Sequence, residues 1–112
     1  MKKSIARNFQ HQVKFLENFA TNELEHERWQ EKFAVYAEIK PICENRFIAI
    51  EHLSFGHVMT EGYYSFKIRF IKNITTNMRI LFKERYFEIK RIINILEQDK
   101  FLNIIGLEIY VS

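Results

Sequence analysis

The feature of this sequence that most constrains its fold is an alternation of apolar and polar side chains between Tyr63 and Ile71. One side of this segment would carry the apolar residues Tyr64, Phe66, Ile68 and Phe70. The other side would carry Ser65, Lys67 and Arg69. A period of two residues is that of a β-strand with one buried face, so the pattern predicts a strand here.

The same alternation recurs in the segment Phe33–Pro41, where the proline is expected to end the strand. Two further runs rich in β-branched and aromatic residues, Arg79–Lys83 and Tyr86–Ile95, are separated by Glu84 and Arg85 alone. Such a short separation predicts a tight antiparallel hairpin. The turn holds no glycine, so its type stays open.

The last run, Phe101–Val111, predicts a closing strand with a bend at Gly106. Between the first two strands, Phe47, Ile50 and Leu53 recur at near-helical spacing, which predicts a short helix capped by Asn45. We therefore expect residues 45–62 to form a helix and loop insertion, with Gly56 ending the helix and Gly62 preceding the next strand.

The N-terminal segment is ambiguous when its residues are considered alone. A helical spacing of three and four residues joins Ile5, Phe9, Val13, Leu16, Ala20 and Leu24. A strand-like alternation joins Phe9, His11, Val13 and Phe15. Both interpretations are compatible with the local pattern, and residues 1–8 are expected to lie outside the ordered part of the domain.

Composition limits the class of protein. With 112 residues, 47% of them hydrophobic and 28% charged, the chain has the size and composition of one globular domain spanning residues 1–112. Eleven Phe, five Tyr and one Trp favour packed sheet surfaces. The single cysteine, Cys43, cannot form an intrachain disulfide, which favours a reducing compartment. Since no apolar run approaches the length of a membrane span or of a signal peptide, we expect no membrane association.

Motifs that carry chemistry are missing from the sequence. The four histidines show no metal-ligand spacing, and no nucleophile elbow, phosphate-binding loop or dinucleotide fingerprint occurs. Cys43 is followed by Glu44, whose charge would raise the pKa of a thiol and make it a poor nucleophile. We therefore predict no enzyme activity, no cofactor and no metal site.

Charge is distributed unevenly. The window from Lys67 to Arg91 holds eight basic side chains against two acidic ones. The basic residues are Lys67, Arg69, Lys72, Arg79, Lys83, Arg85, Lys90 and Arg91. This basic stripe is a candidate interface or DNA-channel lining. The acidic residues Glu23, Glu25, Glu27 and Glu31 form a candidate patch that would face the stripe of a neighbouring copy.

Several fragments, taken in order, resemble the phage head-tail adaptor family, which comprises small head-closure or stopper proteins. The fragments are Trp29, Val35–Pro41, Ser65–Phe70, Ile74 with Met78–Phe82, Arg85–Ile89 and Ile92–Asn94. The resemblance covers about residues 7 to 111. Two positions depart from the family pattern, since Glu84 replaces the usual turn glycine and Ser65 replaces a frequent histidine.

The resemblance implies a mainly β fold, a small antiparallel β-barrel or sandwich with one short helix inserted between strands. It also favours a strand across Phe9 to Phe15. The implied function is structural: a homo-oligomeric, dodecameric ring that bridges the portal or adaptor complex to tail proteins, formed by a chain that is monomeric or weakly associated in isolation. Double-stranded DNA would pass through its channel without sequence readout. The protein would reside in the virion, and in the host cytoplasm before assembly.

An alternative follows from the residues themselves. Aromatic and basic residues interleave in Tyr63–Phe70 and Phe82–Arg91, as in barrels that bind single-stranded nucleic acid.

Overall fold

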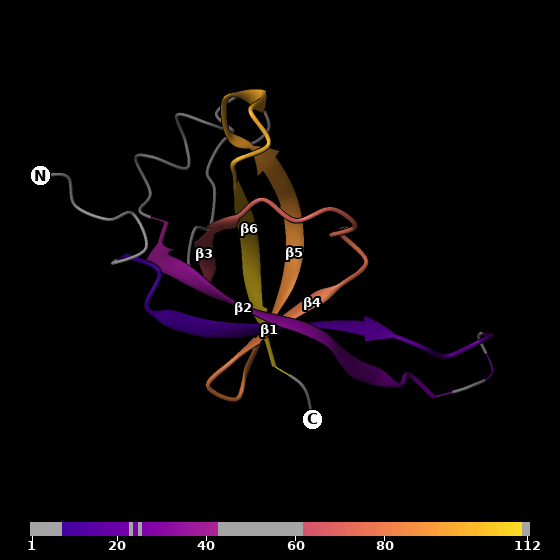
Figure 1. The fold of residues 1–112 in the computed structure, drawn as a ribbon. Helices are drawn as coiled ribbons and strands as arrows, with labels where there is room; N and C mark the ends of the chain where they lie inside the picture. The colour runs from indigo at the N-terminus through magenta and orange to yellow at the C-terminus, as the bar shows by residue number, and fades with distance from the viewer. Residues whose placement is uncertain (1–7, 23, 25, 43–61, 111–112) are drawn as a thin grey trace, which may run out of the picture.

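The computed structural model describes residues 8–22, 24, 26–42 and 62–110. They form an antiparallel barrel that closes in the strand order β1-β2-β3-β6-β5-β4 (Figure 1). The strands are β1 (His11–Asn18), β2 (Trp29–Pro41), β3 (Tyr63–Arg69), β4 (Arg79–Phe82), β5 (Arg85–Asn94) and β6 (Phe101–Ile109). A short 3-10 turn, η2 (Ile95–Glu97), links β5 to β6. The predicted mainly β fold is confirmed, as a barrel rather than a sandwich.

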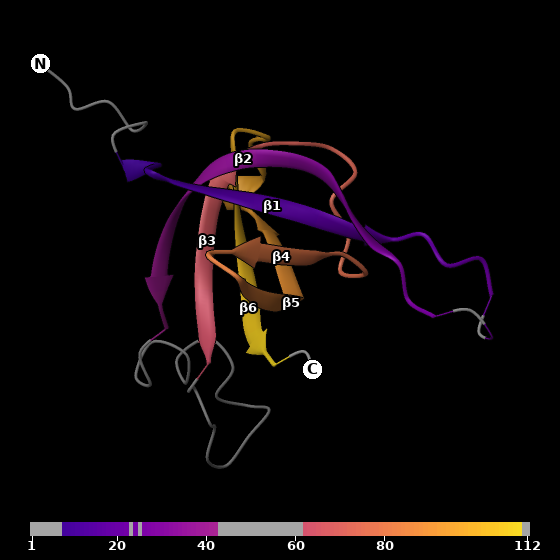
Figure 2. The same ribbon diagram turned by 90° about the horizontal axis from the view of Figure 1, so that it is seen from below.

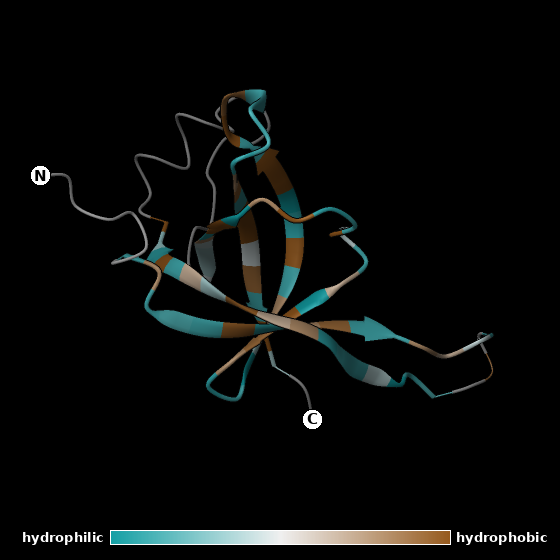
Figure 3. Ribbon diagram, in the orientation of Figure 1, coloured by the Kyte–Doolittle hydropathy of each residue, from teal (hydrophilic) through white to brown (hydrophobic). Residues whose placement is uncertain are grey.

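The core of the barrel is built from alternate residues of every strand. Phe66 and Ile68 of β3 are fully buried, so the alternation between Tyr63 and Ile71 is that of a strand with one face in the core. Other fully buried side chains are Val13, Phe15, Ala37, Ile80, Phe87 and Ile104. Apolar and polar positions accordingly alternate along the ribbons (Figure 3). The apolar faces of the strands meet inside the barrel, where the alternate apolar residues of each strand are buried against one another.

The N-terminal segment is a strand, as the family resemblance implied, and the helical spacing was coincidental. Strand β1 begins at His11, two residues later than Phe9, and runs to Asn18. Val13 and Phe15 point into the core, while Lys14 between them is exposed. Pairing with both β2 and β4 makes β1 part of the closed wall.

The predicted hairpin joins β4 and β5, but its turn lies one residue earlier, at Lys83 and Glu84. Both residues have positive φ, 52° and 63°. That is the sign required at both central positions of a type I′ turn, which matches the twist of the flanking strands. The turn is therefore made without glycine, at the cost of two side-chain-bearing residues in the left-handed region.

The irregularity expected at Gly106 falls on the opposite strand. Ile89 pairs with Gly106 and Arg91 pairs with Ile105, so Lys90 is an extra residue in β5. This bulge lets Lys90 and Arg91 both face outward while Ile89 and Ile92 both pack on the core. Gly106 itself allows a close approach, because a Cβ there would lie 3.0 Å from Cε1 of Phe66.

Gly62 precedes β3 as predicted and has a φ of 90°, which glycine adopts without strain. The helix predicted between Asn45 and Leu53 lies outside the described residues. Among the residues that are described, no helix is long and apolar enough to cross a membrane.

Candidate functional site

Between β1 and β2 the chain projects beyond the barrel as an arm, residues 19–28, of which the structure describes 19–22, 24 and 26–28 (Figures 1 and 2). At its base the backbone N–H of Phe19 donates to the carbonyl oxygen of Arg28 at 2.8 Å. The side-chain oxygen of Asn18 accepts from the backbone N–H of Ala20 at 2.9 Å and of Arg28 at 3.0 Å. Asn18 thereby fixes the direction in which the arm leaves the barrel.

Part of the candidate acidic patch lies on this arm and at its base. Glu27 accepts a hydrogen bond from the indole N–H of Trp29 at 3.0 Å. Glu31 on β2 forms an ion pair with Lys14 at 3.6 Å. Glu23 and Glu25 lie outside the described residues.

The eight basic candidates are divided between two parts of the barrel. Lys67 and Arg69 lie on β3, and Lys72 lies in the loop that follows it. The others lie on β4, the hairpin turn and β5: Arg79, Lys83, Arg85, Lys90 and Arg91. Strand β6 runs between β3 and β5, so the residues form a β3 group and a β4–β5 group.

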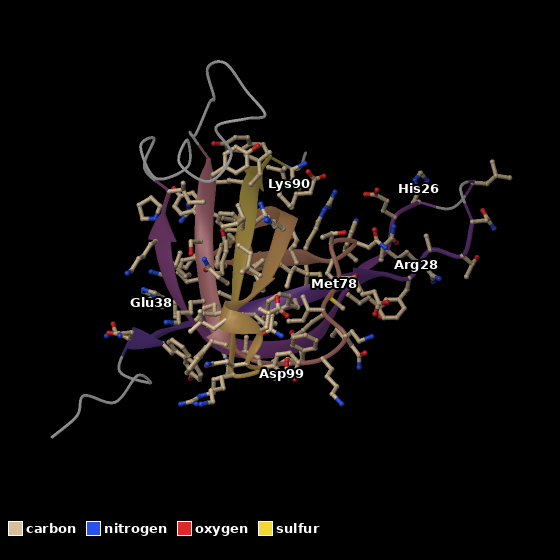
Figure 4. The ribbon with its side chains drawn as sticks, turned by 90° about the horizontal axis from the view of Figure 1, so that it is seen from above. His26, Arg28, Glu38, Met78, Lys90 and Asp99 are labelled. Atoms are coloured by element: carbon tan, nitrogen blue, oxygen red, sulfur yellow. The ribbon has the colours of Figure 1, made fainter. Side chains whose placement is uncertain are left out.

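Within the β4–β5 group, two cations are held by neighbours on the outer surface. The guanidinium of Arg79 lies 4.1 Å from the ring centre of Trp29. The ammonium of Lys90 contacts the carboxylate of Glu88 at 2.9 Å, and this hydrogen bond raises the pKa of Lys90. In Figure 4 Lys90 lies on the barrel, far from His26 and Arg28 of the arm.

Arg85 closes one end of the barrel. It has the same orientation along β5 as Phe87 and Ile89, which are buried. Its Nε and Nη2 donate to the two carboxylate oxygens of Glu108 at 3.1 and 3.2 Å, a contact that raises the pKa of Arg85. The guanidinium also lies about 5 Å from the rings of Tyr64 and Phe87. Arg85 therefore caps the core, which distinguishes it from the outward cations of its group.

The β3 group borders an apolar pocket that the sequence did not reveal. Phe9, Val35, Tyr36, Arg69 and Ile71 line a cavity of about 420 Å³, here called the β2–β3 pocket. These residues come from three separate segments, so no local pattern connects them. The pairing of β2 with β3 ends at Glu38 and Lys67, and the pocket is lined by residues of both strands beyond this point.

Three of the aromatic rings on which the nucleic-acid alternative rests are core residues. Phe66, Phe82 and Phe87 are buried, so they are closed to an incoming base. These three rings therefore cannot stack on bases, whereas Tyr63, Tyr64 and Tyr86 are only partly buried.

In the described part of the chain, no group of three or more His, Cys, Asp or Glu side chains is arranged to hold a metal ion. His11, one of the histidines considered in the sequence, packs against the ring of Phe82 at 5.3 Å. The features that stand out are therefore surfaces: the arm, the two basic groups and the β2–β3 pocket.

The barrel resembles two solved structures at low sequence identity. Protein SF1141 from Shigella flexneri 2a aligns with a TM-score of 0.68 and 14% identity, over 94% of this chain and 96% of that chain. A chain of the virion of a native gene transfer agent particle aligns with a TM-score of 0.60 and 16% identity, over 91% and 96%. Both likenesses concern the fold.

The search of curated proteins found no match. The family described as phage head completion protein matches residues 6–108, which include β1 to β5, the arm, the pocket and all of β6 except Ile109. A match over nearly the whole chain shows that this protein belongs to the phage head completion protein family, and that it is a structural component of the virion with a role in joining head and tail.

Proposed function

We propose that the chain assembles as a dodecameric ring that bridges the portal or adaptor complex of a DNA-filled head to the tail proteins. The chain acts without catalysis and without a cofactor. Before assembly it is a monomer in the host cytoplasm. Its partners are other copies of itself, the portal or adaptor complex, and tail proteins.

The observation that carries the proposal is the combination of a closed barrel with a projecting arm. Closure pairs the strands into one wall and removes the long open edges through which β proteins aggregate. The arm stands away from that wall (Figure 2). A rigid unit with a protruding element suits a ring, in which each copy contacts the next through two different surfaces.

The basic groups supply a surface for DNA passage. Outward cations such as Lys67 and Arg91 can contact phosphates, which positions a duplex without reading its sequence. Arg85 is not expected to contribute, since it is engaged with Glu108.

Co-sedimentation tests the proposal. The purified chain is mixed with DNA-filled heads that carry the portal and adaptor, and with otherwise identical heads that lack them. We expect the chain to sediment with the first heads in the amount of one ring per head, and to remain in the supernatant with the second. Absence of binding, or equal binding to both kinds of head, contradicts the proposal.

A further inference from the structure

We propose that in the assembled ring the arm of one copy docks onto the next copy, with Leu24 inserted in the β2–β3 pocket. This inference rests on the proposed ring, and it names the surfaces that hold neighbouring copies together. It would make the arm the connecting element and the pocket its receptor.

The pocket is open because the pairing of β2 with β3 stops early. The paired residues run from Pro41 with Tyr64 to Glu38 with Lys67. Beyond that point Tyr36 of β2 is 57% exposed, so a large ring stands on the outer surface of the barrel wall. Apolar surface in a concave site is the usual receptor for an apolar anchor.

Leu24 has the properties of such an anchor. It is 96% exposed near the tip of the arm, and its backbone N–H is held by the side-chain oxygen of Asn22 at 2.8 Å. In the sequence it stands between Glu23 and Glu25. An apolar side chain flanked by carboxylates is suited to an apolar pocket with a cation at its rim.

Arg69 is that cation. Its guanidinium lies 5.8 Å from the ring centre of Phe9, and no carboxylate of the described residues pairs with it. Residues 67–72 carry three basic side chains and no acidic one, whereas residues 19–28 carry three acidic side chains and one basic one. The two surfaces are therefore complementary in charge as well as in polarity.

The arm cannot reach the pocket of its own chain. Phe9 precedes the first residue of β1, and the arm follows its last residue, so the two lie at opposite ends of this strand (Figure 1). A strand of this length spans about 25 Å. Contact between different surfaces of successive copies is the heterologous type that generates rings.

Cross-linking tests the contact while leaving Leu24 and Tyr36 intact. In a Cys43→Ser background, one variant carries His26→Cys on the arm and the other carries Gln12→Cys, which pairs with Tyr36 in the sheet. The two variants are mixed, free at high concentration or on portal-bearing heads, and treated with a short bis-maleimide. On heads, we expect the cross-link between position 26 of one copy and position 12 of another, called the 26–12 product, to exceed the cross-links that join two copies of the same variant.

Four further variants test which side chains hold the contact. Leu24→Glu should lower the yield of the 26–12 product about ten- to a hundredfold, because it replaces the buried anchor by a charge. Leu96→Glu is the matched control, since Leu96 is also exposed, at 77%, but lies on η2. Arg69→Glu should lower the yield as well. The triple variant Glu23→Lys/Glu25→Lys/Arg69→Glu should restore it by exchanging the charges.

The outcomes separate this inference from the proposed function. If the chain binds heads but the 26–12 product does not form, or Gln12→Cys joins a different protein, the inference is overturned and the proposed function stands. If the product forms in free solution while heads are not bound, the inference stands and the proposed function fails. If neither product nor binding is found, both are overturned.

Discussion

The arm links β1 to β2 and so adjoins the barrel along the chain, yet the two regions are held together differently. In the barrel, β1 buries Val13 and Phe15 completely among residues of the other strands. In the arm, Phe19 and Leu24 stay exposed, and the base is held by two backbone N–H groups that donate to the side-chain oxygen of Asn18. A two-stranded ribbon without a core is marginally stable in water. The comparison teaches that stability is concentrated in the barrel, while the capacity for new contacts is concentrated in the arm.

The strongest test of this contrast compares a core side chain with an arm side chain. Phe66 is fully buried and packs edge-on against Phe87 at 4.9 Å between ring centres. Phe66→Ala should lower the free energy of unfolding by about 3–5 kcal/mol. Leu24→Ala should change it by less than about 0.5 kcal/mol. Urea unfolding followed by circular dichroism measures both, and similar losses in the two variants would contradict the contrast.

A smaller effect is expected where the barrel depends on the absence of a side chain. Gly106→Ala places a Cβ 3.0 Å from Cε1 of Phe66 and 3.3 Å from Cβ of Phe87. Overpacking of this kind should destabilise the barrel by about 1–3 kcal/mol in the same unfolding experiment. In the double variant with Phe66→Leu, the total loss should be smaller than the sum of the single losses. Additive losses would show that the close contact between position 106 and Phe66 is not the cause of the destabilisation.

The arm should respond to a substitution that leaves the barrel unchanged. Asn18→Ala removes the oxygen that accepts from the backbone N–H groups of Ala20 and Arg28. The loss of these hydrogen bonds should lower the local stability of the arm by about 1 kcal/mol. Hydrogen exchange should accelerate at these two amides, while core amides such as that of Ile68 keep their protection. Asn22→Ala, nearer the tip, is the control. Faster exchange throughout the barrel would mean that arm and barrel unfold together.

The smallest expected effect concerns an exposed ion pair on the barrel surface. The hydrogen bond that Lys90 donates to Glu88 raises the pKa of Lys90 above its ordinary 10.5, although burial acts to lower it. A raised pKa stabilises the fold below pH 10.5, and this stabilisation is lost as the pH rises through the folded-state value. Because both side chains are nearly half exposed, the contribution should be only about 0.2–1 kcal/mol.

Lys90→Met should therefore reduce the free energy of unfolding at pH 8 and not at pH 12, in urea titrations at each pH. An equal loss at both values would assign the effect to packing of the lysine stem rather than to its charge.

The strands could be predicted from the sequence because a period of two residues records one buried face directly. The segment around Phe66 is the clearest case, and only its end differs, at Arg69 rather than Ile71. At β1 two periods coincided, and pairing with β2 and β4 decided between them. In β5 the alternation breaks at Lys90 and Arg91, where a bulge changes which face each residue occupies.

The candidate site was predicted less completely. The eight basic residues are close in the sequence and were predicted to form one stripe. In the barrel, β6 lies between β3 and β5 and divides them into two groups. Arg85 looked like a surface cation, and its pairing with Glu108 depends on β6, which is distant in the chain. The β2–β3 pocket joins Phe9, Tyr36 and Ile71, three positions that only the closed sheet brings together.

Cryo-electron microscopy of portal-bearing heads saturated with the chain tests the central claim most directly. We expect a closed ring of barrels between the portal complex and the position of the tail, with each arm resting on the next barrel. Heads with an empty portal vertex, or barrels bound elsewhere on the capsid, would contradict it.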